Sequence, residues 1–226
     1  MQQRILTLLF LGIWILGNSQ DTKSIYPNFI GQNLNSIEND TDWKILQKSS
    51  GDLNNDGLVD YAVILESKAS IPMKKCSDCK LFKNKPRIIL VILNQNGNES
   101  VIIQNNKFIA LGDQGGMSPY LEPEISIINE FLYIYYQYTR SNQSYTFEFQ
   151  NNQMVIVKAE SNGVHAASGN FESDRYDFKK REIISETGNI SQEKVQTEII
   201  KFDVKPKSLS EFEEMYKWKI TEYKNL

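Results

Sequence analysis

The sequence predicts a mainly β protein, built as an antiparallel meander or sandwich or as a partial-propeller-like sheet, with one short C-terminal helix. Several short apolar runs rich in β-branched residues end in turn-forming residues, as buried strands do. Tyr145, Phe147 and Phe149 alternate with polar residues, which is the period of two expected for a strand with one apolar face. Sequence signals for helices are scarce by comparison.

The first 19 residues predict a secretory signal peptide. Arg4 precedes an uncharged and mostly apolar run over residues 5–17, and Gly17 and Ser19 place small residues before a cleavage point after Ser19. The run is too short to span a hydrocarbon core of about 30 Å comfortably. We therefore expect an exported protein, periplasmic or extracellular, in which residues 20–226 form a single β-rich domain.

The strands are expected in order along this domain. The apolar runs 61–65 and 87–93 predict buried strands, and 101–104 follows the turn at 94–97 so closely that it predicts a hairpin. Four further strands are predicted at 125–128, 131–138, 144–150 and 154–158. Because parallel neighbours would need crossovers of about a dozen residues, such close spacing predicts an antiparallel meander.

The last third of the chain is less regular. Segments 176–185 and 194–204 predict two strands around a turn at 187–189, with Val195, Thr197 and Ile199, and also Phe202, facing the core. Residues 179–181, which are all basic, are expected at a solvated strand edge. Ser210 to Glu213 has capping-box spacing before Met215, Tyr216 and Trp218, and so predicts the C-terminal helix. A short helix within 28–37 is a further expectation.

Composition excludes several classes of function. No second long apolar stretch follows the signal peptide, so no integral membrane segment is expected after cleavage. The 25 Lys and Arg against 28 Asp and Glu give a net charge of −3, which lacks the basic excess of a nucleic-acid-binding protein. Two Cys and one His cannot supply the four ligands of a zinc finger.

The segment 51–61 carries the one motif with a defined chemistry. Asp52, Asn54 and Asp56 recur at every second residue, Gly57 permits a sharp bend, and Leu58 can offer its carbonyl oxygen. Hard Ca²⁺ takes six to eight oxygen ligands from such a curled backbone. Asp60 can close this site, which gives an Asp-rich calcium loop over residues 52–60. An EF-hand would need Glu at the twelfth position, which here is Val63.

This loop resembles the D-x-N-x-D-G-x-x-D loop of FG-GAP and VCBS-type repeats, in which Ca²⁺ ties a turn between two β-strands. The resemblance covers residues 51–66 and implies one structural Ca²⁺ held by Asp52, Asn54, Asp56, Leu58 and Asp60. The whole layout also resembles that of small secreted bacterial proteins with one such segment near the mature N-terminus. The alternative is an ordinary turn, since Asp, Asn and Gly are common turn formers.

Cys76 and Cys79 form a C-x-x-C pair. In an exported chain this spacing favours a local disulfide, with redox-active or free thiols as the alternatives. The single imidazole, His165, lies in no nucleophile-elbow pattern. The Gly-rich stretch 112–116 lacks the ending of a phosphate loop and is expected to be a surface loop or, alternatively, a loop that contacts a ligand.

Aromatic residues gather between Phe131 and Phe149. They favour strands and pair across them, so most are expected in the core. Tyr133 and Tyr135 point away from Tyr136 and Tyr138, so an exposed aromatic binding face is also possible.

Two functions are therefore open. The first is a secreted, non-enzymatic binding module for an envelope or extracellular protein or glycan. The second is a secreted hydrolase of polysaccharide or peptidoglycan, which would need two facing carboxyls in a cleft, one with a raised pKa.

Overall fold

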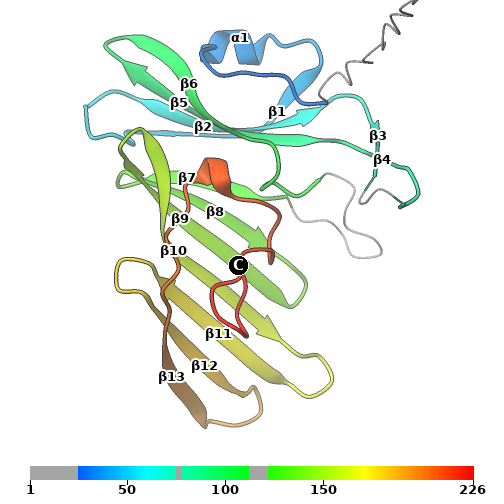
Figure 1. Cartoon of the computed structure of the whole chain (residues 1–226), viewed down its shortest axis with the longest axis vertical. Coiled ribbons are helices and arrows are strands. Elements are labelled where there is room, and N and C mark those ends of the chain that lie inside the picture. The colour runs from blue at the N-terminus through cyan, green and yellow to red at the C-terminus, as the bar shows by residue number, and fades with distance from the viewer. Residues whose placement is uncertain (1–24, 75–77, 112–121) are drawn as a thin grey trace, which may run out of the picture.

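The computed structural model describes residues 25–74, 78–111 and 122–226, and over these residues the protein is mainly β. The chain forms a four-stranded sheet and a seven-stranded sheet. Figure 1 shows the smaller sheet above the larger one, which runs down the long axis of the molecule. Thirteen strands lie in the described residues, all paired antiparallel. In this part of the chain no helix has the length and apolar character needed to cross a membrane.

The four-stranded sheet has the order β1-β2-β5-β6. Its strands are β1 (Trp43–Gly51), β2 (Asp60–Ser67), β5 (Arg87–Gln95) and β6 (Asn98–Asn105). The two central strands are buried on both faces, which explains their continuous apolar sequences. One face packs against the N-terminal segment with Phe29 and the short helix α1 (Leu34–Glu38), where Asn33 caps the helix by accepting from Ser36 N at 2.9 Å.

The seven-stranded sheet is a meander in which every strand pairs with the next along the chain. Its strands are β7 (Glu124–Ile128), β8 (Phe131–Gln137), β9 (Ser141–Gln150), β10 (Gln153–Val164), β11 (Asn170–Asp177), β12 (Glu182–Asn189) and β13 (Val195–Lys201). Two of its two-residue turns begin at Asn129 and Asn151, each with positive φ, as tight hairpins require. The turn between β5 and β6 in the four-stranded sheet begins in the same way at Asn96. The predicted meander is confirmed.

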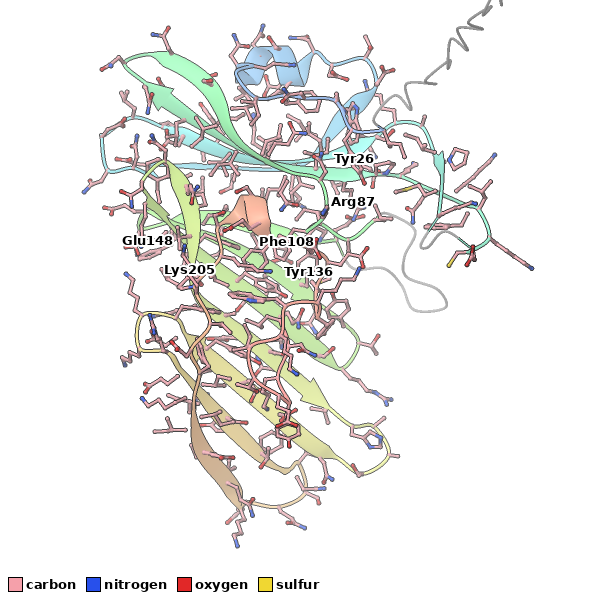
Figure 2. All side chains as sticks on the ribbon, in the orientation of Figure 1. Tyr26, Arg87, Phe108, Tyr136, Glu148 and Lys205 are labelled. Atoms are coloured by element: carbon pink, nitrogen blue, oxygen red, sulfur yellow. The ribbon has the colours of Figure 1, made fainter. Side chains whose placement is uncertain are left out.

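The main core lies between the two sheets, and Figure 2 shows Phe108 and Tyr136 there. Phe108 makes edge contacts with Tyr145 and Phe212, at ring-centroid distances of 4.9 and 5.0 Å. Asn105 fixes the turn before it, because its Oδ1 accepts from Phe108 N at 2.8 Å and its Nδ2 donates to two carbonyls of the C-terminal segment. The C-terminal segment thereby closes the core from one side.

The small sheet β3-β4 and the C-terminal segment complete the described structure. The small sheet pairs β3 (Ile71–Met73) with β4 (Phe82–Asn84). The predicted C-terminal helix is one 3₁₀ turn, η1 (Leu209–Glu211), whose capping box joins Ser208 and Glu211, two residues earlier than expected. Beyond it the chain doubles back, and Trp218 and Leu226 exchange both backbone hydrogen bonds.

Three expectations for the last strands were wrong. Residues 187–189 belong to β12, and the connection to β13 lies at 190–194. The predicted strand 176–185 is interrupted by a turn at 178–181, where Arg181 has positive φ. The basic triplet is therefore a turn and not a strand edge. The outer face of β13 carries Val195, Thr197 and Ile199. Cross-strand pairing places Ile199 in one row with Tyr135 on the outer face, whereas Ile200 lies in the row of buried Ile183 and Tyr145 on the core face. Phe202, by contrast, is buried as predicted.

Candidate functional site

The Asp-rich loop connects β1 to β2 and folds around its own backbone N–H groups. Asp52 Oδ2 accepts from Gly57 N at 2.8 Å, and Asp56 Oδ1 accepts from Leu58 N at 2.8 Å. Asn54 Nδ2 donates to Asp56 Oδ2 at 2.9 Å. Gly57, at φ 81°, supplies the bend that the motif predicted. The side chains expected to hold a cation thus point into the loop, where they stabilise the turn.

Asp60 lies beneath this loop and is fully buried, with an exposure of 0%. Its Oδ2 accepts from Leu53 N at 2.8 Å, and its Oδ1 accepts from Asn94 N, at the end of β5, at 2.9 Å. Burial raises the pKa of this carboxyl, two backbone hydrogen bonds oppose that effect, and the carboxylates of Asp56 and Asp52 raise the pKa further. The loop therefore concentrates negative charge that a cation would neutralise.

The donor atoms of this loop suit Ca²⁺ in chemistry, because all five proposed ligands are oxygens. Each carboxylate oxygen has two lone pairs, so an oxygen that accepts an N–H keeps a second acceptor site for a cation. Within residues 25–74, 78–111 and 122–226, however, no three Asp, Glu, His or Cys side chains are gathered as a metal-holding group. A calcium site here would need Asp52, Asp56 and Asp60 to close further around the ion.

The predicted disulfide falls partly outside the described residues. Cys79 is described, but Cys76 belongs to residues 75–77, so the pairing stays a prediction. The Gly-rich stretch 112–116 also lies outside the described residues. His165 is exposed, and its Nδ1 lies 3.0 Å from Ser168 Oγ, a contact within its own turn.

A groove lies on the face of the seven-stranded sheet that points away from the core. It has a volume of about 370 Å³ and crosses β8, β9 and β10. Seven side chains line it: Phe131, Tyr133, Ser144, Thr146, Val157, Lys158 and Glu160. On β8 the core-facing residues Leu132, Ile134 and Tyr136 are fully buried, whereas Phe131, Tyr133 and Tyr135 are only half-buried. One aromatic face of this strand is thus partly open, as the alternation of its residues suggested.

A β-bulge shapes this groove. Ile156 pairs with Phe147 and Lys158 with Thr146, so Val157 is an extra residue in β10. A bulge bends its strand and redirects the neighbouring side chains. The rings of Phe131 and Tyr133 lie 6.4 Å apart at 60°, and Lys158 and Glu160 are exposed beside them. The groove therefore combines an aromatic wall with hydroxyl, cationic and anionic groups, a combination that sequence patterns had indicated only through the aromatic cluster.

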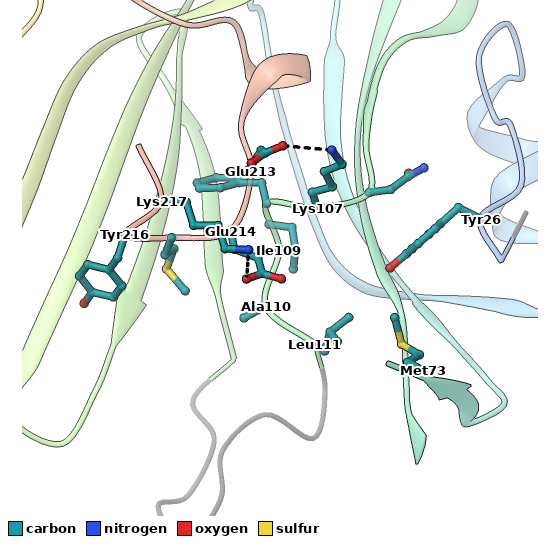
Figure 3. A pocket seen from close by; sticks show the side chains of 13 residues that line it. Tyr26, Met73, Lys107, Ile109, Ala110, Leu111, Glu213, Glu214, Tyr216 and Lys217 are labelled. Atoms are coloured by element: carbon teal, nitrogen blue, oxygen red, sulfur yellow. Dashed lines mark hydrogen bonds and ion pairs between the residues drawn. The ribbon is translucent and has the colours of Figure 1, made fainter. Parts of the chain in front are cut away.

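A second hollow, of about 480 Å³, lies where the two sheets meet (Figure 3). Its walls include Met73, Ile109 and Met215, and the ion pairs Lys107–Glu213 and Lys217–Glu214 lie beside them, at 3.1 and 2.9 Å. Burial and the nearby Glu214 carboxylate raise the pKa of Tyr26 on the opposite wall. Leu111 also lines this hollow and is the last described residue before the gap at 112–121, so we assign no ligand to it.

No protein-family model, curated protein or solved structure matches this chain. The resemblance of the Asp-rich loop to FG-GAP and VCBS-type repeats therefore rests on the motif from Asp52 to Asp60 alone.

Proposed function

We propose that this protein is an exported binding module, stabilised by one Ca²⁺ in the loop 52–60, and that it binds a glycan of the cell envelope or its surroundings. The groove on β8, β9 and β10 is the observation that carries this proposal. Sugar rings present apolar C–H faces that stack on aromatic side chains, and their hydroxyls both donate and accept hydrogen bonds. Phe131 and Tyr133 would meet those faces.

The polar lining of the groove favours a glycan over an apolar ligand. The Lys158 ammonium can only donate hydrogen bonds and the Glu160 carboxylate only accepts them, while the hydroxyls of Ser144 and Thr146 do both. The groove also opens on the face of a continuous sheet, so a linear polymer could cross it without being enclosed. A few convergent polar groups beside an apolar wall are the usual composition of a small-molecule site.

A binding role is also favoured over hydrolysis by the position of the raised-pKa acid. Within the part of the chain that the structure describes, Asp60 is the carboxyl with a raised pKa, and it is enclosed beneath the Asp-rich loop and bonded to two backbone N–H groups. A general acid for glycoside cleavage must reach the scissile oxygen. Asp60 is not among the residues that line the groove.

The first prediction concerns Tyr133. We expect Tyr133→Ala to weaken glycan binding at least tenfold, because loss of a stacked aromatic ring removes contact area that a small site cannot replace. Binding is measured by screening the mature protein on an array of envelope glycans and titrating the best ligand by calorimetry. The matched control is Tyr223→Ala, which removes an exposed tyrosine that does not line the groove and should leave the affinity unchanged.

Two results would contradict the glycan assignment. One is unchanged affinity of Tyr133→Ala for the glycan, and the other is failure of every glycan on the array to bind. Capture of an envelope protein whose binding is lost in Tyr133→Ala would keep the groove as a binding site and replace the glycan by a protein.

Export is tested separately. Arg4 and the apolar run 5–17 predict removal of the first 19 residues, so mature protein from expressing cells should begin near Gln20. N-terminal sequencing of the periplasmic and culture fractions measures this. Intact protein that begins at Met1 and stays in the cytosolic fraction would show that the segment is not a signal peptide.

A further inference from the structure

The seven-stranded sheet has one edge that no described residue covers. At its other edge, β7 packs against β1, and Ile127 N donates to Ser49 Oγ at 2.9 Å. At the far end, β13 pairs only with β12 among the described residues. Figure 1 shows β13 at the end of the molecule away from the four-stranded sheet. A free strand edge offers unpaired N–H and C=O groups to another chain.

β13 exposes apolar side chains at this edge, whereas edge strands that resist pairing commonly carry charged ones. Val195 and Ile199 are 48% and 61% exposed on the same face of the sheet, and they have no core to pack against. This is the pair that sequence reasoning had assigned to the core. Two exposed β-branched residues four positions apart on one strand face are a cost in a monomer, because burial of such side chains is favourable.

The backbone of β13 is oriented for pairing at the free edge. Phe202, just after β13, donates its N–H to the carbonyl oxygen of Arg181, just before β12, at 3.1 Å. These two opposed residues therefore form a hydrogen-bonded pair that continues the ladder between β12 and β13. Hydrogen-bonded and non-hydrogen-bonded pairs alternate along an antiparallel ladder. The N–H and C=O groups of Val195, Thr197 and Ile199 therefore point outward, to the free edge.

We propose that β13 pairs antiparallel with β13 of a second copy of this chain, about a two-fold axis at Thr197. In this register Thr197 lies opposite its own copy, and Val195 lies opposite Ile199 of the second copy on both sides of the axis. Glu193 lies opposite Lys201 in the same way, so opposite charges meet at each end. Aliphatic, threonine and opposite-charge pairs are the favourable cross-strand combinations.

The register with its axis one residue further along the strand is worse. An axis at Glu198 would place that carboxylate opposite its own copy, and like charges directly opposite are destabilising. It would also place Val195 against Lys201. The sequence of the strand therefore favours the axis at Thr197 over the axis at Glu198, and it gives the self-complementarity that an isologous dimer requires.

The dimer has a consequence for the groove. Opposed residues of an antiparallel pair lie on the same face of the sheet, so the outer faces of the two copies would be continuous. Both grooves would then open on one side of the dimer, where a single polymer could reach them. Two linked sites can raise overall avidity strongly without new contacts. The dimer itself does not depend on what the groove binds.

Sedimentation equilibrium of the mature protein tests the dimer. Pairing of one seven-residue strand buries less than a standard interface, so dissociation on the order of micromolar is expected, with the mass doubling as concentration rises. Ile199→Lys should keep the mass of one chain over the same range. Ile128→Lys, the same substitution at an isoleucine 52% exposed on β7, should dimerise like the wild type.

Cross-linking tests the register. Opposed Cα atoms in a hydrogen-bonded antiparallel pair are about 5.5 Å apart, within the range of a disulfide. Thr197→Cys should give a covalent dimer under mild oxidation, whereas Gln196→Cys and the wild type should not. A single-chain mass at every concentration, or equal cross-linking of the two cysteine variants, would overturn the proposal.

Discussion

Arg87→Met is expected to lower the free energy of unfolding by about 3 kcal/mol or more. Arg87 is 1% exposed, and its Nε and Nη2 donate to Glu66 Oε2 at 2.9 and 2.6 Å. It also bonds to Ala110 O and Glu122, and so joins three segments of the chain. Removal of one partner leaves a buried charge uncompensated, which typically costs about 3–5 kcal/mol. The lower end applies here, because Lys44 still contacts Glu66 at 3.0 Å.

Urea unfolding measures this loss, with Arg175→Met as the control. Arg175 also makes two hydrogen bonds to a carboxylate, that of Glu186, but the pair lies in solvent. Loss of an exposed pair costs about 0–1 kcal/mol, so the control separates burial from charge removal. Equal losses for the two variants would mean that burial of the Arg87 pair contributes nothing.

The pH dependence gives a second measurement. Burial acts to raise the pKa of Glu66, but the hydrogen bonds from Arg87 and Lys44 outweigh burial and hold it below its ordinary value. A carboxyl with a lowered folded-state pKa contributes stability above its unfolded pKa of about 4.3 and loses it as pH falls through the folded pKa. The difference between wild type and Arg87→Met should therefore shrink in acid, as Glu66 becomes neutral in both proteins.

Ca²⁺ is expected to raise the melting temperature by about 5–10 °C at a hundredfold excess over its dissociation constant. Binding to the folded state alone contributes about 2.7 kcal/mol at that excess, and a domain of this size gains about 2–4 °C per kcal/mol. The physical reason is the loop itself, where the carboxylates of Asp52 and Asp56 lie close enough to Asp60 to raise its pKa. Mg²⁺ should do much less, because it gives up its waters reluctantly.

Two substitutions distinguish the stabilisation that comes from Ca²⁺ from the stabilisation that comes from the hydrogen bonds of the turn. Asp56→Ala removes an exposed carboxylate and should abolish the Ca²⁺ effect, with a loss in EDTA of about 0.5–1.5 kcal/mol, the typical net contribution of a hydrogen bond such as the one it accepts from Leu58 N. Asp60→Ala should abolish it too, and should also cost about 1–3 kcal/mol in EDTA, because it leaves the N–H groups of buried Leu53 and half-buried Asn94 without their acceptor. Asp42→Ala, an exposed acid outside the loop, should keep the full gain.

Melting curves with EDTA, with Ca²⁺ and with Mg²⁺ measure these effects. Equal melting temperatures for the wild type in all three would leave Gly51–Tyr61 as an ordinary turn. The same result would remove calcium from the proposed function without touching the groove.

The sequence by itself determined the fold class and most of the meander. Runs of β-branched and aromatic residues that are separated by Asn-rich turns predict strands. Turns of two residues are too short for a parallel crossover, so neighbouring strands must be antiparallel. Alternation in β8 and β9 also separated the core face from the outer face correctly, since Tyr145 and Phe147 are buried. These features are local, so a local pattern suffices to predict them.

Tertiary structure decided what depends on distant partners. The sequence does not predict β1, because the half-exposed residues of this strand show little apolar pattern. The prediction for the core face of β13 is wrong, because a period of two does not say which of the two faces meets the core. Burial of Asp60 against Asn94 and the bulge at Val157 likewise arise from pairing between strands. The proposed calcium ligands can thus be predicted from the sequence, because they lie within nine consecutive residues. The groove and the free strand edge cannot, because they form only when strands distant in the sequence pair with one another.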